Sequence, residues 1–226
     1  MSEQLNFDLP TKPALGRHDF FVSPANALAV ALIDTWADWP QGKLLLYGPE
    51  GSGKSHLAHV WAAQSGARIV KAAMLKEEEV PPLASTHLAV EDVHEILGDM
   101  AGETTLFHLH NLALSDGRKL LFTGQGAPKT WGFALADLQS RLTGTHQVAL
   151  TQPDDALLLA VLAKLFADRQ ISPRPDVIPY LVGQIDRSFI AAAEIVDCLD
   201  QGSLAEKRNL TRAFAAQVLA EMRKQT

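Results

Sequence analysis

The pattern of apolar and polar positions in the first two thirds of the chain predicts alternating strands and helices. Short apolar runs typical of buried parallel strands begin with KLLLYG at 43–48, and four more follow: RIVKA, HLAVED, KLLFTG and QVAL. Between the third and fourth runs, Leu106, Leu109 and Ala113 recur at i, i+3 and i+7, which predicts a helix. Strands that alternate with helices indicate an α/β fold with a parallel sheet, here of five strands.

The pattern changes near Pro153, where the strands stop and four apolar-rich helical segments follow. Near the other end, Ser23 and Pro24 suit the N-cap and the first position of a helix. The first residues contain prolines and a glycine without helical period, so we expect a flexible tail there. The predicted organisation is a tail at 1–17, an α/β domain at 18–152 and a small all-helical domain at 153–226.

The composition is that of an ordinary globular protein and excludes few classes of function. Of 226 residues, 47% are hydrophobic and 20% are charged, as in ordinary globular proteins. The net charge of −6 and the lack of a Lys/Arg block argue against broad contact with nucleic-acid phosphates. The one cysteine, Cys198, is expected to be a buried thiol. Without a signal-peptide pattern or an apolar run of about 18 residues, we expect a cytoplasmic protein with no membrane partner.

Two histidines separated by one residue, His108 and His110, lie within the helix predicted between the third and fourth strands. Side chains two positions apart on a helix point about 200° away from each other. We therefore expect no shared metal ion at this pair.

The segment GPEGSGKS at 48–55 matches the phosphate-binding pattern G-x-x-x-x-G-K-[ST] in full, between a predicted strand and a predicted helix. Its glycines let the backbone turn tightly so that N–H groups face phosphates, and the following helix adds its dipole. Lys54 supplies a positive charge to the β and γ phosphates, and Ser55 supplies a hydroxyl to Mg²⁺. We expect ADP or ATP with Mg²⁺ at this loop.

Two carboxylates, Glu91 and Asp92, follow the buried run LAV at 88–90. A phosphate site of this class needs a carboxylate at the end of a nearby strand, to hold Mg²⁺ and to orient water. We expect Glu91 to act as a metal ligand and Asp92 to take part in catalysis. The alternative is a solvated strand end without a ligand.

In this order the motifs resemble those of AAA+ ATPases, specifically the replication initiator DnaA and its short relatives of the Hda type, over nearly the whole chain. GPEGSGKSHLAH is similar to the family's Walker A motif, LAVEDV to its Walker B motif, and FFVSPAN at 20–26 to its adenine-packing segment. The resemblance implies an AAA+ P-loop domain followed by a helical lid. The cofactor-binding positions that it implies are Phe21, Val22, Gly48, Pro49, Glu50, Gly51, Ser52, Gly53, Lys54, Ser55, His56 and Arg187.

The segment LADLQSRL at 135–142 is similar to the family's box that ends in an arginine finger, and this similarity implies that role for Arg141. An arginine that reaches a neighbouring molecule's γ-phosphate can raise the hydrolysis rate by about 10³–10⁵. The alternative is that Arg141 is a surface residue of a helix that forms an ion pair.

Three positions depart from the family pattern. Glu91 stands where Asp is usual, and Gln125 stands where the sensor 1 turn usually carries an acid. Ile190 stands where the lid normally places an arginine on the nucleotide, and Arg187, three residues earlier, is a candidate substitute. These departures imply a protein that holds nucleotide, preferably ADP, and is itself at most a weak ATPase.

The segment QLNFDL at 4–9 resembles the Q-L-x-L-x-L type of peptide that binds the bacterial sliding clamp. In that interpretation Gln4 makes polar contacts, and Leu5, Phe7 and Leu9 are the apolar anchors. The alternative is a tail whose apolar residues dock on the protein's own surface.

The resemblance implies a regulator of replication initiation that is tethered to the DNA polymerase III sliding clamp and promotes hydrolysis of ATP bound to the DnaA initiator. DNA would be contacted only indirectly, because the helix-turn-helix domain of DnaA has no counterpart in this sequence, and self-association is an open question. Two alternatives remain: a P-loop kinase or ATPase of a small metabolite, and an AAA+ adaptor for another replication protein. The apolar helices after Pro153 count against the kinase, whose lid would need phosphate-clamping arginines.

Overall fold

The structure, a computed structural model, describes residues 21–206 and 209–225. Within these ranges, five short strands lie where the apolar runs predict them. They are β1 (Lys43–Tyr47), β2 (Arg68–Lys71), β3 (Leu88–Glu91), β4 (Leu120–Gly124) and β5 (His146–Ala149). Neighbouring strands all pair in parallel, in the order β2-β3-β4-β1-β5, which confirms the expected five-stranded parallel sheet.

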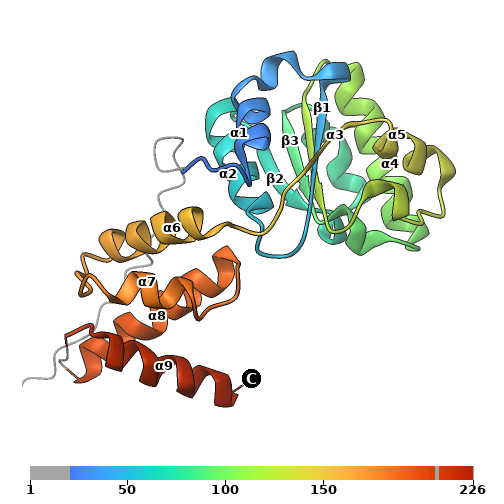
Figure 1. The fold of residues 1–226 in the computed structure, drawn as a ribbon. Helices are drawn as coiled ribbons and strands as arrows, with labels where there is room; N and C mark the ends of the chain where they lie inside the picture. Colours follow the sequence, from blue (N-terminus) through green and yellow to red (C-terminus); the bar gives the residue numbers. More distant parts are fainter. Residues whose placement is uncertain (1–20, 207–208, 226) are drawn as a thin grey trace, which may run out of the picture.

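Helices cover both faces of this sheet (Figure 1). Successive strand residues point to opposite faces, so Leu44 and Leu46 pack with α1 and α2, whereas Leu45 packs with α3, α4 and α5. The three central strands, β1, β3 and β4, are therefore buried on both faces, as their continuous apolar runs predict, whereas the edge strands β2 and β5 are partly exposed. The helices are α1 (Ala27–Asp34), α2 (Lys54–Ser65), α3 (Val80–Ala84), α4 (Met100–Ser115) and α5 (Ala136–Thr143).

The chain after β5 forms a separate group of helices beside the α/β part (Figure 1). These are α6 (Asp155–Asp168), α7 (Val177–Val182), α8 (Phe189–Glu206) and α9 (Arg212–Gln225). They pack around their own core, which includes Leu162, Leu181, Ile195 and Phe214. Among the residues that the structure describes, no helix has the length and apolarity that crossing a bilayer requires.

The first helix begins three residues later than the sequence predicts. The hydroxyl of Ser23 accepts a hydrogen bond from the backbone N–H of Ala25, and the Ser23 carbonyl accepts from Asn26 and Ala27. Asn26, with φ of −131°, then departs from helical geometry and is itself the N-cap of α1. Ser23 thus caps an isolated turn ahead of the helix, and its prediction as the N-cap of α1 is wrong.

Two buried polar side chains, Lys43 at the start of β1 and His110 on α4, lie in contact with each other. Lys43 and His110 are only 3% and 2% exposed, and Lys43 Nζ lies 3.4 Å from His110 Nε2. Nδ1 of His110 lies 3.1 Å from Oδ1 of Asn111, which can only accept, so Nδ1 carries the proton and Nε2 accepts from Lys43. Burial lowers the pKa of His110 to about 4, and the charges of Lys43 and Arg141 add to this effect. The ring is therefore neutral near pH 7.

This buried histidine predicts a loss of stability in mild acid. Between the ordinary pKa of 6.5 and the folded value of about 4, the unfolded chain binds a proton that the folded chain excludes. The free energy of unfolding therefore falls as pH decreases through this window, by up to about 3 kcal/mol from His110. His110→Gln keeps an acceptor for Lys43 but does not titrate, so its decrease should be smaller by that amount.

Urea denaturation at pH 7 and pH 4.5 measures the difference, because other titrating groups contribute equally to both proteins. An equal decrease in the free energy of unfolding of the wild-type protein and His110→Gln would contradict the assignment.

Candidate functional site

The loop that follows β1 forms a tight turn at the carboxyl edge of the sheet. Gly51 and Gly53 have φ of 69° and 93°, a backbone region that glycine enters without strain. Gly53 is the N-cap of α2, so the amino end of this helix opens toward the loop. The segment matching the phosphate-binding pattern therefore has the strand–loop–helix context that the pattern requires.

Lys54 lies at the base of the loop and is buried. Its Nζ donates to the backbone carbonyls of Gly48, at 3.0 Å, and Pro49, at 2.7 Å. Burial lowers the pKa of this ammonium group, while the carboxylates of Asp92, Glu50 and Glu91 act in the opposite direction. A bound anion would act in the same direction as these carboxylates, so the site favours a phosphate group beside Lys54.

A cavity of about 400 Å³ lies beside the loop and is lined by residues from five parts of the fold. Basic, acidic and apolar side chains all reach it, including a second lysine, Lys71, from the end of β2. The residues that line it are Glu50, Gly51, Gly53, Lys54, Ser55, His56, Lys71, Asp92, Glu95, Gln125, Phe189 and Ile190. The sequence-predicted positions Glu50, Gly51, Gly53, Lys54, Ser55, His56 and Asp92 are thus brought together.

The two carboxylates after β3 have different surroundings. Asp92 adopts left-handed backbone geometry, with φ of 56°, and its side chain lines the cavity. Glu91 is the last residue of β3 and is buried outside the cavity lining. Asp92 also raises the pKa of Lys54 more than Glu91 does. The structure therefore places Asp92, rather than Glu91, in the cavity that Lys54 also lines.

Two buried oxygen atoms beside the loop have no hydrogen-bond partner among the described residues: Oγ of Ser52 and Oε1 of Glu91. Buried oxygens of this kind are suited to bound water, a cation or the donor groups of a ligand. No group of three or more His, Cys, Asp or Glu side chains in the described ranges is arranged to hold a metal by itself. A divalent cation would therefore need oxygens from a ligand in addition to Ser55, Glu91 or Asp92.

The helical group after β5 contacts the loop directly. The backbone N–H of Phe189, at the start of α8, donates to the carbonyl of Gly51 at 3.0 Å. A Cβ on Gly51 would lie 2.3 Å from Cβ of Ser188, and one on Gly53 would lie 2.7 Å from the Phe189 ring. Both glycines are therefore needed for the approach of α8 as well as for the turn of the loop.

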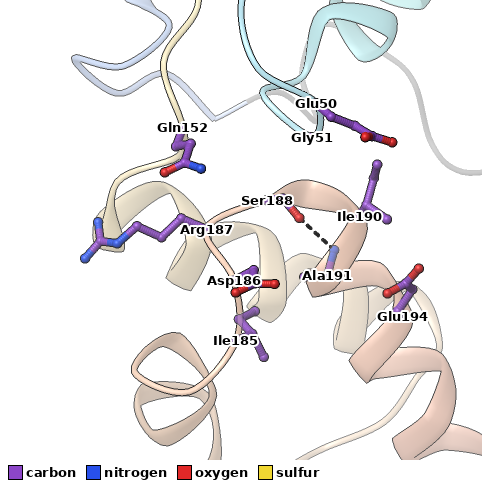
Figure 2. Close-up of a pocket in the computed structure, with 10 residues that line it drawn as sticks. All are labelled: Glu50, Gly51, Gln152, Ile185, Asp186, Arg187, Ser188, Ile190, Ala191 and Glu194. Atoms are coloured by element: carbon purple, nitrogen blue, oxygen red, sulfur yellow. Dashed lines mark hydrogen bonds between the residues drawn. The ribbon is translucent and has the colours of Figure 1, made fainter. Parts of the chain in front are cut away.

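Arg187 lies away from the loop cavity. It lines a second cavity of about 590 Å³ and pairs with Asp155 at 2.7 Å, with both side chains more than half exposed. Figure 2 shows its side chain extending away from Glu50 and Ile190. Ile190, which is 45% exposed, lines both cavities, so the position where the sequence lacks an arginine does face the loop.

The remaining predicted residues lie outside these cavities. Phe21 and Val22 are 47% and 44% exposed, which leaves their apolar side chains open to a ligand or partner. Arg141 is exposed on α5, and its backbone carbonyl accepts a hydrogen bond from Lys43 at the amino end of β1. Gln4, Leu5, Phe7 and Leu9 lie outside the described residues.

Sequence reasoning missed three residues of the loop cavity: Lys71, Glu95 and Phe189. Lys71 comes directly after an apolar strand run, as Asp92 does. Its position at the carboxyl edge of the sheet, and so near the loop, was therefore predictable from the sequence. Phe189 gave no signal, because its position depends on how α8 packs against the loop.

The comparisons with solved structures find the same fold in replication initiators. The chain is similar to domain III of DnaA from Thermotoga maritima, with a TM-score of 0.82 at 18% identity, over 94% of this chain and 98% of that one. It is also similar to AMPPCP-bound DnaA from Aquifex aeolicus, with a TM-score of 0.67 at 17% identity, over 85% of this chain and 66% of that one. No family model matches the chain.

A second group of similar structures is RuvB, the Holliday junction branch migration motor of Thermotoga maritima. One of these has a TM-score of 0.60 at 14% identity, over 79% of this chain and 61% of that one. At such identities the likeness establishes the fold. The chain thus has the DnaA-like AAA+ architecture that its motifs resemble, with a parallel α/β part followed by a helical lid.

The contact between loop and lid predicts unequal effects of two glycine substitutions. Gly51 and Gly66 have nearly equal φ, 69° and 72°, but a Cβ on Gly66 meets nothing within 4 Å. Gly66→Ala should therefore lower the free energy of unfolding only through the strain of a positive φ angle in alanine, by about 1 kcal/mol. Gly51→Ala should cost about 1–3 kcal/mol more, because Ser188 and α8 must move.

Thermal unfolding of the two variants, side by side, measures this difference. Equal destabilisation by both substitutions would show that α8 does not rest on the loop.

Proposed function

We propose that this chain is a nucleotide-binding regulator of replication initiation, which binds the DNA polymerase III sliding clamp through residues 4–9 and promotes hydrolysis of ATP bound to DnaA. The observation that carries this proposal is the place of Arg141: exposed on a DnaA-like fold and remote from the chain's own phosphate loop.

Nucleotide binding rests on the loop and its cavity. The loop provides a turned backbone, the amino end of α2 and the ammonium group of Lys54, which together suit a di- or triphosphate. The similar Aquifex aeolicus DnaA is bound to AMPPCP, an ATP analogue. Phe21 and Val22 are exposed and apolar, and in our proposal they pack on the adenine ring.

Mg²⁺ fits the same cavity. In our proposal it is held by the Ser55 hydroxyl and by carboxylate oxygen from Glu91 or Asp92, together with phosphate oxygens. When bound, it would supply positive charge that neutralises the phosphates. Asp92 lines the cavity, and Oε1 of the adjacent Glu91, which does not line it, has no partner among the described residues, so both are compatible with this role.

The chain's own hydrolysis is expected to be weak, with ADP as the resident nucleotide. Ile190 faces the cavity in place of a cation, and the Phe189 ring packs against the same loop. Arg187 is held by Asp155 on the far side of Ile190, so it does not replace the missing charge in this arrangement. The lid residues that line this cavity, Phe189 and Ile190, are apolar and offer no positive charge to a developing transition state.

Arg141 suits action on a different molecule. Its carbonyl bonds to Lys43 at the amino end of β1, whereas the phosphate loop follows Tyr47 at the carboxyl end. Four strand residues span about 13 Å, which exceeds the reach of an arginine side chain. The exposed guanidinium can therefore approach a nucleotide held by a neighbouring protein, and not the one bound by its own loop.

The N-terminal peptide supplies the tether in this proposal. Burial of Leu5, Phe7 and Leu9 would contribute roughly 1.5–3 kcal/mol each, and ordering the segment would cost about 2–5 kcal/mol. The remainder corresponds to weak binding, in the high-micromolar range or weaker. A ring with several identical pockets strengthens such contacts by avidity when the bound protein self-associates.

Arg141→Ala should abolish the acceleration of DnaA-bound ATP hydrolysis measured with this protein, the sliding clamp and DNA. The expected loss is about 10³-fold or more in the accelerated rate, because the arginine would neutralise charge that develops on the γ-phosphate. Arg223→Ala, which removes an exposed arginine from α9, is the matched control and should retain full acceleration.

Clamp binding and binding of a fluorescent ADP analogue should be unchanged in Arg141→Ala. Full acceleration by this variant would refute the proposed mechanism.

Replacement of both Leu5 and Phe7 by alanine should remove detectable binding to the sliding clamp, because two of the three apolar anchors are lost. Replacement of both Asn6 and Asp8, the intervening polar residues, should leave binding within about twofold. Surface plasmon resonance with the full chain and immobilised clamp measures both. Equal affinity of the two double variants would place the clamp-binding surface elsewhere on the chain.

A further inference from the structure

The helix that carries Arg141 is short and has no side-chain cap of its own. α5 has eight residues, and its N-cap, Leu135, provides no side-chain hydrogen bond. An isolated helix of this length is marginal in water, so its position depends on contacts from outside it. Leu138 and Leu142 anchor one face in the core, but apolar contacts alone permit small shifts along the helix axis.

A buried carboxylate holds the first end of α5. Glu103, on α4, is 0% exposed, and its Oε2 accepts from the backbone N–H of Leu135 at 2.7 Å. Its Oε1 accepts from Ala134 at 3.1 Å and from Gly98 at 2.8 Å. A negative charge at the amino end of a helix is stabilised by the helix dipole and by these N–H groups. Glu103 therefore replaces the missing cap from another helix.

A buried ammonium group holds the other end. Lys43 Nζ donates to the backbone carbonyl of Arg141 at 3.0 Å, and the Thr145 hydroxyl donates to the same carbonyl at 2.8 Å. Nε2 of His110 accepts a second hydrogen bond from Lys43 Nζ, at 3.4 Å. The helix dipole stabilises a positive charge at the carboxyl end of a helix, as it stabilises a negative charge at the amino end.

These two charges are unusual because each is buried without an opposite charge to pair with. Within the described residues, neither Lys43 nor Glu103 forms an ion pair, and their hydrogen-bond partners are backbone groups at the ends of α5 and, for the rest, Gly98 and His110. Burial of an unpaired charge is costly, and apolar residues would fill the same space more favourably. Their arrangement gives α5 two fixed points, one at each end.

We propose that Lys43 and Glu103, here called the α5 brace, are positioning residues for Arg141. They fix the axial position of α5, and so fix where the guanidinium emerges from the surface. A displacement of about 1 Å in a group that acts on a reacting phosphate can cost about 10²-fold in rate. The inference rests on the proposed function, because it assigns the brace a role in the reaction that Arg141 is proposed to promote.

The test measures acceleration of DnaA-bound ATP hydrolysis as a function of the concentration of this protein, with clamp and DNA present. Lys43→Met and Glu103→Gln should each lower the maximal rate by about 10- to 100-fold, with little change in the half-saturating concentration. Lys43→Arg retains a charged donor and should recover part of the rate. Lys119→Met, at the same end of the sheet, is the matched control and should behave as the wild-type protein.

Two further measurements separate positioning from a general loss of structure. Amide hydrogen exchange should rise at α5, while binding of a fluorescent ADP analogue stays unchanged. If Lys43→Met does not fold, Thr145→Val removes the second donor to the same carbonyl and carries the test.

Full maximal acceleration by the folded brace variants, with Arg141→Ala still inactive, would overturn this inference and leave the proposed function standing. Full acceleration by Arg141→Ala would instead remove the proposed function, and the role of the brace with it.

Discussion

The parallel pairing of β1 with β4 and β5 is the constraint on which the rest of the structure depends. Parallel strands place all their carboxyl ends at one edge of the sheet, so loops from distant parts of the chain must meet there. The phosphate loop after β1, Asp92 after β3 and Gln125 after β4 share one cavity for this reason. The direction of the strands is therefore what brings these residues together at one edge of the sheet.

The same strand separates the two proposed activities. Tyr47 ends β1 at the phosphate loop, while Lys43 begins it and bonds to the carbonyl of Arg141. The nucleotide cavity and the arginine thus lie toward opposite ends of one rigid element. In the proposed function, this separation keeps Arg141 away from the chain's own nucleotide and leaves it available to a neighbouring molecule.

The loop between β1 and α2 is constrained both by its own backbone geometry and by contact with the lid. Gly51 and Gly53 are required by their positive φ angles for the turn around a phosphate. They are also required by close approach, because Ser188 and Phe189 occupy the space that a Cβ would fill. Any movement of α8 would therefore displace the loop between β1 and α2.

Elements that depend on interactions between neighbouring residues are predictable from the sequence alone. Apolar runs located all five strands, and the glycine-rich pattern located the loop between β1 and α2, because these signals lie within a few consecutive residues. The three-dimensional structure was needed to show that α1 starts after Asn26 and that Val80, Pro81 and Pro82 open the short helix α3. It also decided that Asp92, rather than Glu91, faces the cavity. The bonds from Lys43 to Arg141 and from Glu103 to Leu135 join residues 98 and 32 positions apart. Such contacts depend on how strands and helices pack, so no local pattern records them.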